Sequence, residues 1–199
     1  MSVGFFMGIH ASYTEESQAS AANYIKSINQ ALKQSKLPQY VEPAESPDVY
    51  NDGLFGRSAL DHHGAGGLME LAEKASERMN APHLELLTKN PYRVAYLPLD
   101  FVTPLLTDHT ERIFNKVVDL WVGSAPRLLV ELIELAPLLG IPLRSGELSD
   151  ETTEQINDVA PLEEGDNSRN AEDERSAWLL LFESARLAVQ HRVALSLAG

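Results

Sequence analysis

The sequence predicts an α+β fold, a helix-dominated single domain with a small sheet of two or three short strands. Several segments repeat apolar residues every three or four positions, which is the periodicity of helices that pack one face on a core. Residues 3–10 and 93–97 have the composition of short strands. The chain has 199 residues, of which 44% are hydrophobic, and can bury a core without a disulfide or a structural metal.

The first half of the chain predicts two strands and two helices. Residues 3–10 form the first strand, and a capping-box pattern, Ser12 followed by Glu15, begins a helix that ends before Pro38. The apolar stripe of that helix consists of Ala21, Ile25, Ile28 and Leu32. The stripe of a second helix consists of Leu68, Leu71, Ala72, Ala75 and Met79. Residues 93–97 form a strand that stops at Pro98 or lies at a sheet edge.

Residues 108–122 favour a helix, although part of them fits a strand. Asp108 and Glu111 have capping-box spacing. One helical face would carry Ile113, Phe114, Val117 and Trp121. The apolar run from Val117 to Val122 is equally compatible with a strand, because periodicity does not separate the two structures in a short run.

Two apolar helices complete the predicted fold. Ser124 caps the first of them, which Pro137 kinks or ends and Gly140 closes. The second runs from Ala171 to about Leu197 and is apolar around most of its circumference. We expect it to be covered by its own domain or by a second copy of the chain, and we favour a homodimer.

The negative charge is concentrated in one segment. The formal net charge is -13, and the stretch from Glu147 to Glu174 holds 11 acidic residues and one basic residue. This stretch is poor in apolar residues, so the expected organisation is a globular body (1–146), an acidic mobile segment (147–170) and a C-terminal helix (171–199) that packs on the body or on a second subunit.

Composition excludes several classes of protein. The absence of cysteine excludes disulfides, thiolate zinc sites and cysteine nucleophiles. The net charge argues against binding to nucleic acid or to an anionic membrane surface. Neither a secretory signal nor a run of about 20 apolar residues is recognisable, so we expect a cytoplasmic protein.

Asp61, His62 and His63 are the sharpest candidates for chemistry. A carboxylate and two imidazoles are suitable ligands for zinc or manganese. The triplet resembles the motif of the DHH phosphoesterases, in which it helps to hold catalytic manganese. The resemblance is limited to these three residues, since the buried strand and the upstream aspartate motifs of that family have no counterpart here. Helix capping by His62 and His63 is the alternative.

Other candidate residues have a structural explanation beside the functional one. The run that contains Gly64, Gly66 and Gly67 precedes a helix and could expose N–H groups to an anion, or could be a turn that allows close packing. His10 and Asp100 each follow a strand and could converge with the histidine pair on one site.

The sequence thus favours an intracellular protein-binding module of accessory, inhibitor or immunity type, without catalysis and without a cofactor. Its expected partner is an unidentified protein or a second copy of the chain, with no nucleic acid and no membrane. The alternative is a metal-dependent hydrolase that uses Asp61, His62 and His63, and the sequence does not decide whether the chain is an enzyme.

Overall fold

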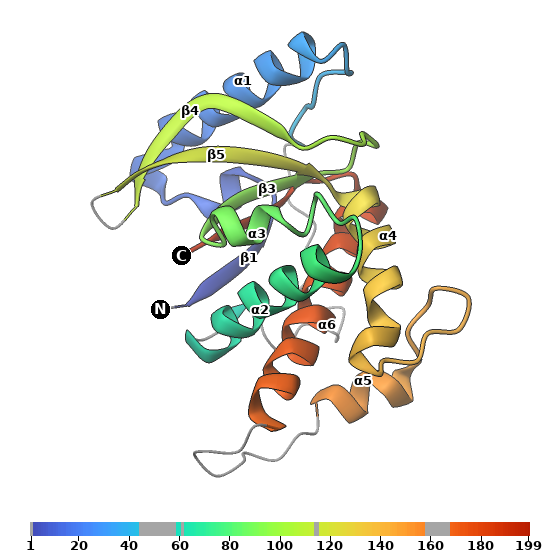
Figure 1. Ribbon diagram of the computed structural model, residues 1–199. Helices are drawn as coiled ribbons and strands as arrows, with labels where there is room; N and C mark the ends of the chain where they lie inside the picture. Colours follow the sequence, from blue (N-terminus) through green and yellow to red (C-terminus); the bar gives the residue numbers. More distant parts are fainter. Residues whose placement is uncertain (1, 44–58, 61, 114–115, 158–167) are drawn as a thin grey trace.

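The computed structural model describes residues 2–43, 59–60, 62–113, 116–157 and 168–199, in which one mixed sheet separates helix α1 from the other long helices (Figure 1). The sheet has six strands in the order β2-β1-β6-β3-β5-β4. The strands are β1 (Val3–Met7), β2 (Ala59–Leu60), β3 (Arg93–Leu97), β4 (Leu105–Ile113), β5 (Lys116–Ser124) and β6 (Leu195–Ala198). Only the β3–β5 pair is parallel. The α+β class is confirmed, but the expectation of two or three strands is wrong.

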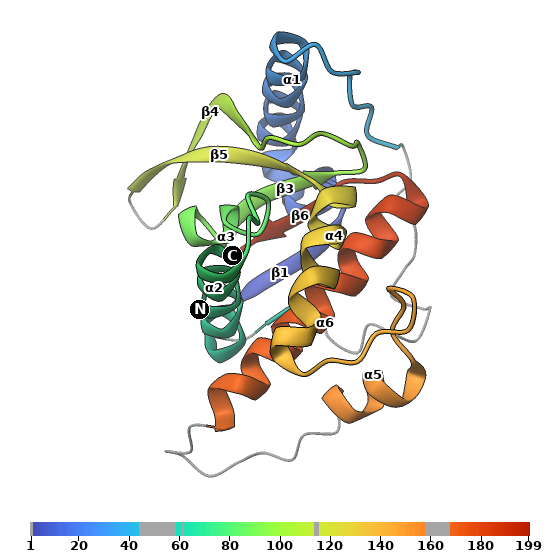
Figure 2. The same ribbon diagram turned by 45° about the vertical axis from the view of Figure 1, so that its right-hand side comes forward.

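The helices lie on both faces of this sheet. They are α1 (Gln18–Gln34), α2 (His62–Arg78), α3 (Leu86–Lys89), α4 (Ala125–Leu135), α5 (Asp150–Asn157) and α6 (Ser168–His191), with a 3-10 turn, η4 (Ala136–Leu139), directly after α4. Helix α1 covers one face, while α2, α4 and α6 cover the other, with α5 beside the lower part of α6 (Figure 2).

Two apolar cores follow from the alternation of side chains along the strands. On β3, Val94 and Tyr96 join the larger core under α2, α4 and α6. Ala95 and Leu97 point the other way and join the smaller core under α1. The sheet therefore keeps the surface of α1 well apart from the surface of the other helices.

The hairpin of β4 and β5 replaces the helix expected at residues 108–122. Leu120 and Val122 are buried in the core under α1, whereas Trp121 between them packs against the core on the opposite face. The O–H of Thr107 on β4 donates to the carbonyl oxygen of Leu120 at 3.0 Å. Both faces of β5 are in contact with protein, so its apolar residues form a continuous run that resembles a buried helix.

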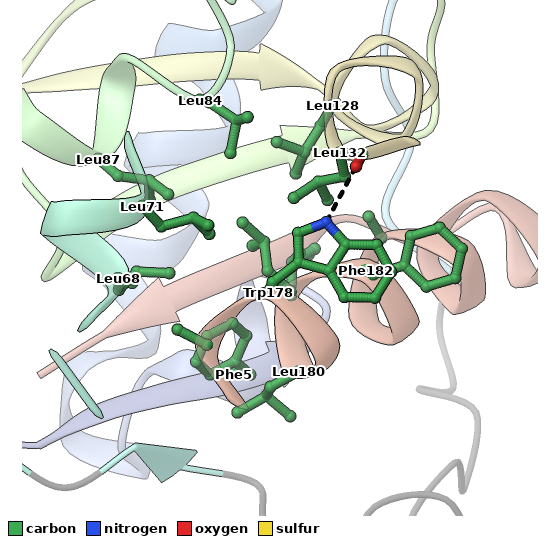
Figure 3. Packing of buried hydrophobic residues seen from close by; sticks show 14 of the residues in the cluster. Phe5, Leu68, Leu71, Leu84, Leu87, Leu128, Leu132, Trp178, Leu180 and Phe182 are labelled. Carbon is green, nitrogen blue, oxygen red and sulfur yellow. Dashed lines mark hydrogen bonds between the residues drawn. The ribbon is translucent and has the colours of Figure 1, made fainter. Parts of the chain in front are cut away.

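Helix α6 is the centre of the larger core, as its composition predicts, but it is shorter than expected. It ends at His191, Arg192 has a φ of 57°, and the chain continues as β6 between β1 and β3. The Nε1–H of Trp178 donates to the carbonyl oxygen of Leu132 at 2.9 Å, and the indole stacks on Phe182 (Figure 3). Its own chain covers most of this helix, and the homodimer stays a prediction.

The acidic segment is ordered in part. Within residues 147–170, helix α5 packs on α6 and buries Thr152 and Ile156, while residues 158–167 lie outside the described part of the chain. The mobility of the segment stays a prediction.

Candidate functional site

Exposed carboxylates gather on the side of the sheet that carries α2, α4, α5 and α6. We call them the acidic face: Glu70, Glu73, Glu77, Glu134, Glu147, Asp150, Glu151 and Glu154. Helix α2 supplies Glu70, Glu73 and Glu77, whose spacing of three and four residues places them on one helical stripe. At 1.5 Å per residue this stripe extends over about 10.5 Å.

A groove lies between α2 and the start of α6. It has a volume of about 440 Å³ and is lined by Glu70, Glu73, Lys74, Glu77, Arg78, Leu138 and Glu174. Glu174 is buried and accepts an ion-pair hydrogen bond from Lys74, which fixes α6 to α2 at this point. The three glutamates of α2 form one wall of the groove, and Leu138 of η4 belongs to the opposite side.

A second hollow joins η4, α5 and the start of α6. It is lined by Gly140, Ile141, Pro142, Thr152, Gln155, Ile156, Glu172 and Arg175. Arg175 donates through Nε to the carbonyl oxygen of Leu139 at 2.9 Å and so holds η4 against α6. The acidic helices α2 and α5 therefore lie on opposite sides of η4.

The far side of the sheet carries a basic helix. Helix α1 contains no acidic residue, and Lys26 and Lys33 on it are exposed, as is Lys36 just after it. The exposed acids on this side lie outside the helix, since Glu15 and Glu16 precede it and Asp108 on β4 accepts a hydrogen bond from Ser27 of α1. The molecule thus presents a basic helix on one face and the acidic face on the other.

The structure leaves the proposed metal ligands untested. Asp61 lies outside the described residues, and His62 and His63 begin α2 with side chains that are not described. Within the described ranges there is no group of three or more histidine, aspartate or glutamate side chains that could hold a metal ion.

The glycine run lies within α2, whereas the sequence placed it before the helix. A Cβ on Gly67 would lie 2.6 Å from the carbonyl carbon of Asp173, so this glycine lets the backbones of α2 and α6 approach each other. A Cβ on Gly64 would lie 2.9 Å from Leu60, whereas Gly66 has nothing within 4 Å. Gly67 therefore has a packing role, and anion binding by Gly64, Gly66 and Gly67 stays a prediction.

His10 and Asp100 have structural partners of their own. The Nδ1 atom of His10 lies 2.7 Å from Oε1 of Gln18, near the start of α1. Asp100 accepts two hydrogen bonds from the guanidinium of Arg127 on α4, at 2.6 and 3.3 Å. These contacts tie a helix start and a loop to their neighbours.

Sequence reasoning missed a buried polar cluster around His83. The ring accepts at Nδ1 from the N–H of Ser124 and donates at Nε2 to the carbonyl oxygen of Val102, and burial lowers the pKa of His83 to about 4. Glu131 accepts from the N–H groups of His83 and Leu84, and burial raises the pKa of Glu131 to about 7. Glu131 lies within the apolar stripe of α4, and this is the sequence feature that could have indicated the cluster. The cluster fixes the start of α4 to the sheet.

Comparisons with curated proteins and with solved structures gave no match. No helix in the described part of the chain is long and apolar enough to cross a membrane.

A comparison with family models gave a match over residues 60–197 to a family described as "Putative DNA-mimic protein". This description points to partners that bind DNA, so it corrects the expectation of a generic accessory module and that of a metal-dependent hydrolase. The expectation of a partner unrelated to nucleic acid is corrected in the same way, because the family description implies partner proteins that bind DNA. The match spans more than two thirds of the sequence, including α2, α4, α5 and α6. The chain therefore belongs to this DNA-mimic family.

Proposed function

We propose that this protein acts as a DNA mimic, in which the acidic face occupies the DNA-binding surface of a partner protein and excludes duplex DNA from it. The observation that carries the proposal, together with family membership, is the gathering of exposed carboxylates on one side of the sheet. The net charge of -13 repels DNA itself and attracts proteins that bind DNA.

The chemistry of DNA-binding proteins supports this assignment. They hold duplex DNA mainly through lysine and arginine contacts to phosphates, and those contacts are independent of base sequence. One DNA strand carries a phosphate about every 3.4 Å, so about three phosphates span the 10.5 Å over which α2 presents Glu70, Glu73 and Glu77. The spacing of the carboxylates on α2 is therefore comparable to the spacing of phosphates on one strand, while Arg78 in the same groove offsets part of their charge.

The distribution of lysine indicates how a basic partner approaches. Lys26, Lys33 and Lys36 on and after α1 repel such a partner, whereas the acidic face attracts it. Electrostatic steering of this kind speeds association and selects one orientation. The fold thus favours binding through α2 and α5 over binding through α1.

The test is competition with DNA. Proteins captured from a cell extract by the immobilised chain should be released by duplex DNA, and their binding should weaken steeply with salt because charge contacts dominate it. The double variant E73Q/E77Q should bind the captured proteins more weakly and with a smaller salt dependence.

A matched control removes the same charge from the other side of the sheet. E15Q/E16Q also neutralises two exposed glutamates, but they precede α1, so binding should stay close to that of the unmodified chain. Captured proteins that duplex DNA fails to release, or two double variants that bind alike, would refute the proposed function.

A further inference from the structure

An apolar ridge crosses the acidic side of the molecule. Val130 on α4 is 47% exposed and Leu138 on η4 is 54% exposed. Glu134, near the end of α4, is exposed between them in the sequence, and Leu138 lies on the 3-10 turn that follows the helix. We call Val130, Glu134 and Leu138 the α4 ridge. Two large apolar side chains are thus exposed, one on α4 and one on the turn that follows it.

Leu138 is presented by an ordered turn. The adjacent Leu139 is buried, and its carbonyl oxygen accepts from Arg175. The N–H of Ile141 donates to the carbonyl oxygen of Ala136 at 2.9 Å, and Gly140 closes the turn with a φ of 68°. These contacts fix the backbone on both sides of Leu138, so its outward position follows from the fold.

Acidic helices lie on both sides of this turn. Leu138 shares the groove with Glu70, Glu73 and Glu77 of α2. Gly140, two residues later, lines the hollow that α5 borders, and α5 carries Asp150, Glu151 and Glu154. The exposed leucine therefore shares a groove with the row of carboxylates on α2, and the acidic helix α5 borders the next hollow along the chain.

We propose that the α4 ridge is the apolar anchor by which this DNA mimic selects its partner, a DNA-binding protein that carries apolar side chains beside its arginines and lysines. This inference rests on the proposed function and adds the selecting contact. Phosphate-like charges position a partner without distinguishing one DNA-binding protein from another. An apolar group flanked by negative charge is what the major groove offers at a thymine methyl group, and proteins contact that methyl with apolar side chains.

The occupant follows from charge complementarity. A second copy of this chain would bring its own acidic face to the ridge, which like charges disfavour. A basic surface with an apolar centre satisfies both the carboxylates and the leucine.

Two helical peptides of 20 residues test the proposal. Both carry the same stripe of arginines, and the neighbouring stripe is leucine in one and glutamine in the other, two residues of similar helix propensity. Binding is measured by fluorescence anisotropy at several salt concentrations. The unmodified chain should bind the leucine peptide about tenfold more tightly, since burial of the half-exposed leucine and valine contributes about this much.

The double variant V130S/L138S should bind the two peptides with equal affinity and unchanged salt dependence. The control V41S alters a valine that is 79% exposed and follows Tyr40 of the core under α1, and it should keep the preference for leucine. A tenfold preference that survives in V130S/L138S, or no preference in the unmodified chain, would overturn the proposal. So would a smaller mass of V130S/L138S by light scattering, because a second copy would then cover the ridge.

Failure of this inference is distinguishable from failure of the proposed function. If the unmodified chain binds both peptides equally while duplex DNA still releases its captured proteins, the anchor is wrong and DNA mimicry stands. If DNA releases nothing, the proposed function fails and the anchor fails with it.

Discussion

Two neighbouring glycines of α2 should respond in opposite directions to the same substitution. In Gly67→Ala, the new Cβ would lie 2.6 Å from the carbonyl carbon of Asp173 and 2.7 Å from its oxygen. Ordinary van der Waals contact begins at 3.4 Å, so α2 and α6 must separate by almost 1 Å. In Gly66→Ala the new Cβ meets nothing within 4 Å.

The magnitudes follow from packing and helix propensity. Overpacking of a close contact costs about 1–3 kcal/mol, and alanine recovers up to about 1 kcal/mol relative to glycine in a helix. Gly67→Ala should therefore lower the free energy of unfolding by about 1–2 kcal/mol. Gly66→Ala should raise it by as much as about 1 kcal/mol, because only the gain in propensity applies.

Urea unfolding followed by circular dichroism measures both changes against the unmodified chain. A Gly67→Ala variant as stable as the unmodified chain would refute the close approach of α2 and α6. A destabilised Gly66→Ala variant would show that this position is packed or that it needs glycine for another reason. Each variant adds one methyl group, and the two substituted positions are adjacent. A difference between their unfolding free energies therefore does not come from charge or from solvent conditions.

Two further variants test the larger core. Trp178→Ala should lower the free energy of unfolding by about 3–5 kcal/mol, because the side chain of Trp178 is fully buried. Trp121→Ala should lower it by less in the same urea titration, because the ring of Trp121 is partly buried and lies under Lys89. Glu131→Gln removes a carboxyl whose pKa is raised by burial from 4.5 to about 7. The stability that this raised pKa contributes is fully present below about pH 4.5 and is lost as the pH rises through 7. When the pH is lowered from about 7.5 to 4.5, the free energy of unfolding of the unmodified chain should rise by up to about 3 kcal/mol relative to that of Glu131→Gln. A difference in unfolding free energy that does not change with pH would contradict the burial of that carboxyl.

The apolar periodicity of the sequence predicted those helices that have one face exposed to solvent. In the stripe of α1, Ala21, Ile28 and Leu32 are buried as expected and Ile25 is partly buried, because the opposite side of the helix meets solvent. The same reasoning failed for β5, both of whose faces contact protein. It failed again for β6, since the run from Val193 to Leu197 continues the apolar composition of α6, and no glycine or proline marks the end of the helix at His191. The pairing of β6 with β1 and β3 is a long-range effect that local composition does not contain.

The candidate site was predicted in part. Counting charge along the chain identified the acidic stretch from Glu147 to Glu174, which includes α5. It missed α2, where Lys74 and Arg78 nearly balance the glutamates in sequence. Only the fold shows that Lys74 is paired with Glu174 and that the glutamates share a groove with Leu138. The surface arises from the apposition of three segments that are far apart in the sequence.

Mimicry of a stiff polymer requires charges held in fixed positions, because ordering flexible side chains and backbone on binding reduces affinity. The glutamates of α2 meet this requirement through the helix that carries them, and α2 is positioned by the close contact of Gly67 with Asp173 and by the Lys74–Glu174 pair. Affinity for a basic partner should therefore depend on packing at positions that never touch that partner. Gly67→Ala changes no charge, yet it should weaken partner binding, whereas Gly66→Ala should leave binding unchanged. An equal affinity of both variants would mean that the line of charge on α2 tolerates displacement and that net charge alone determines binding.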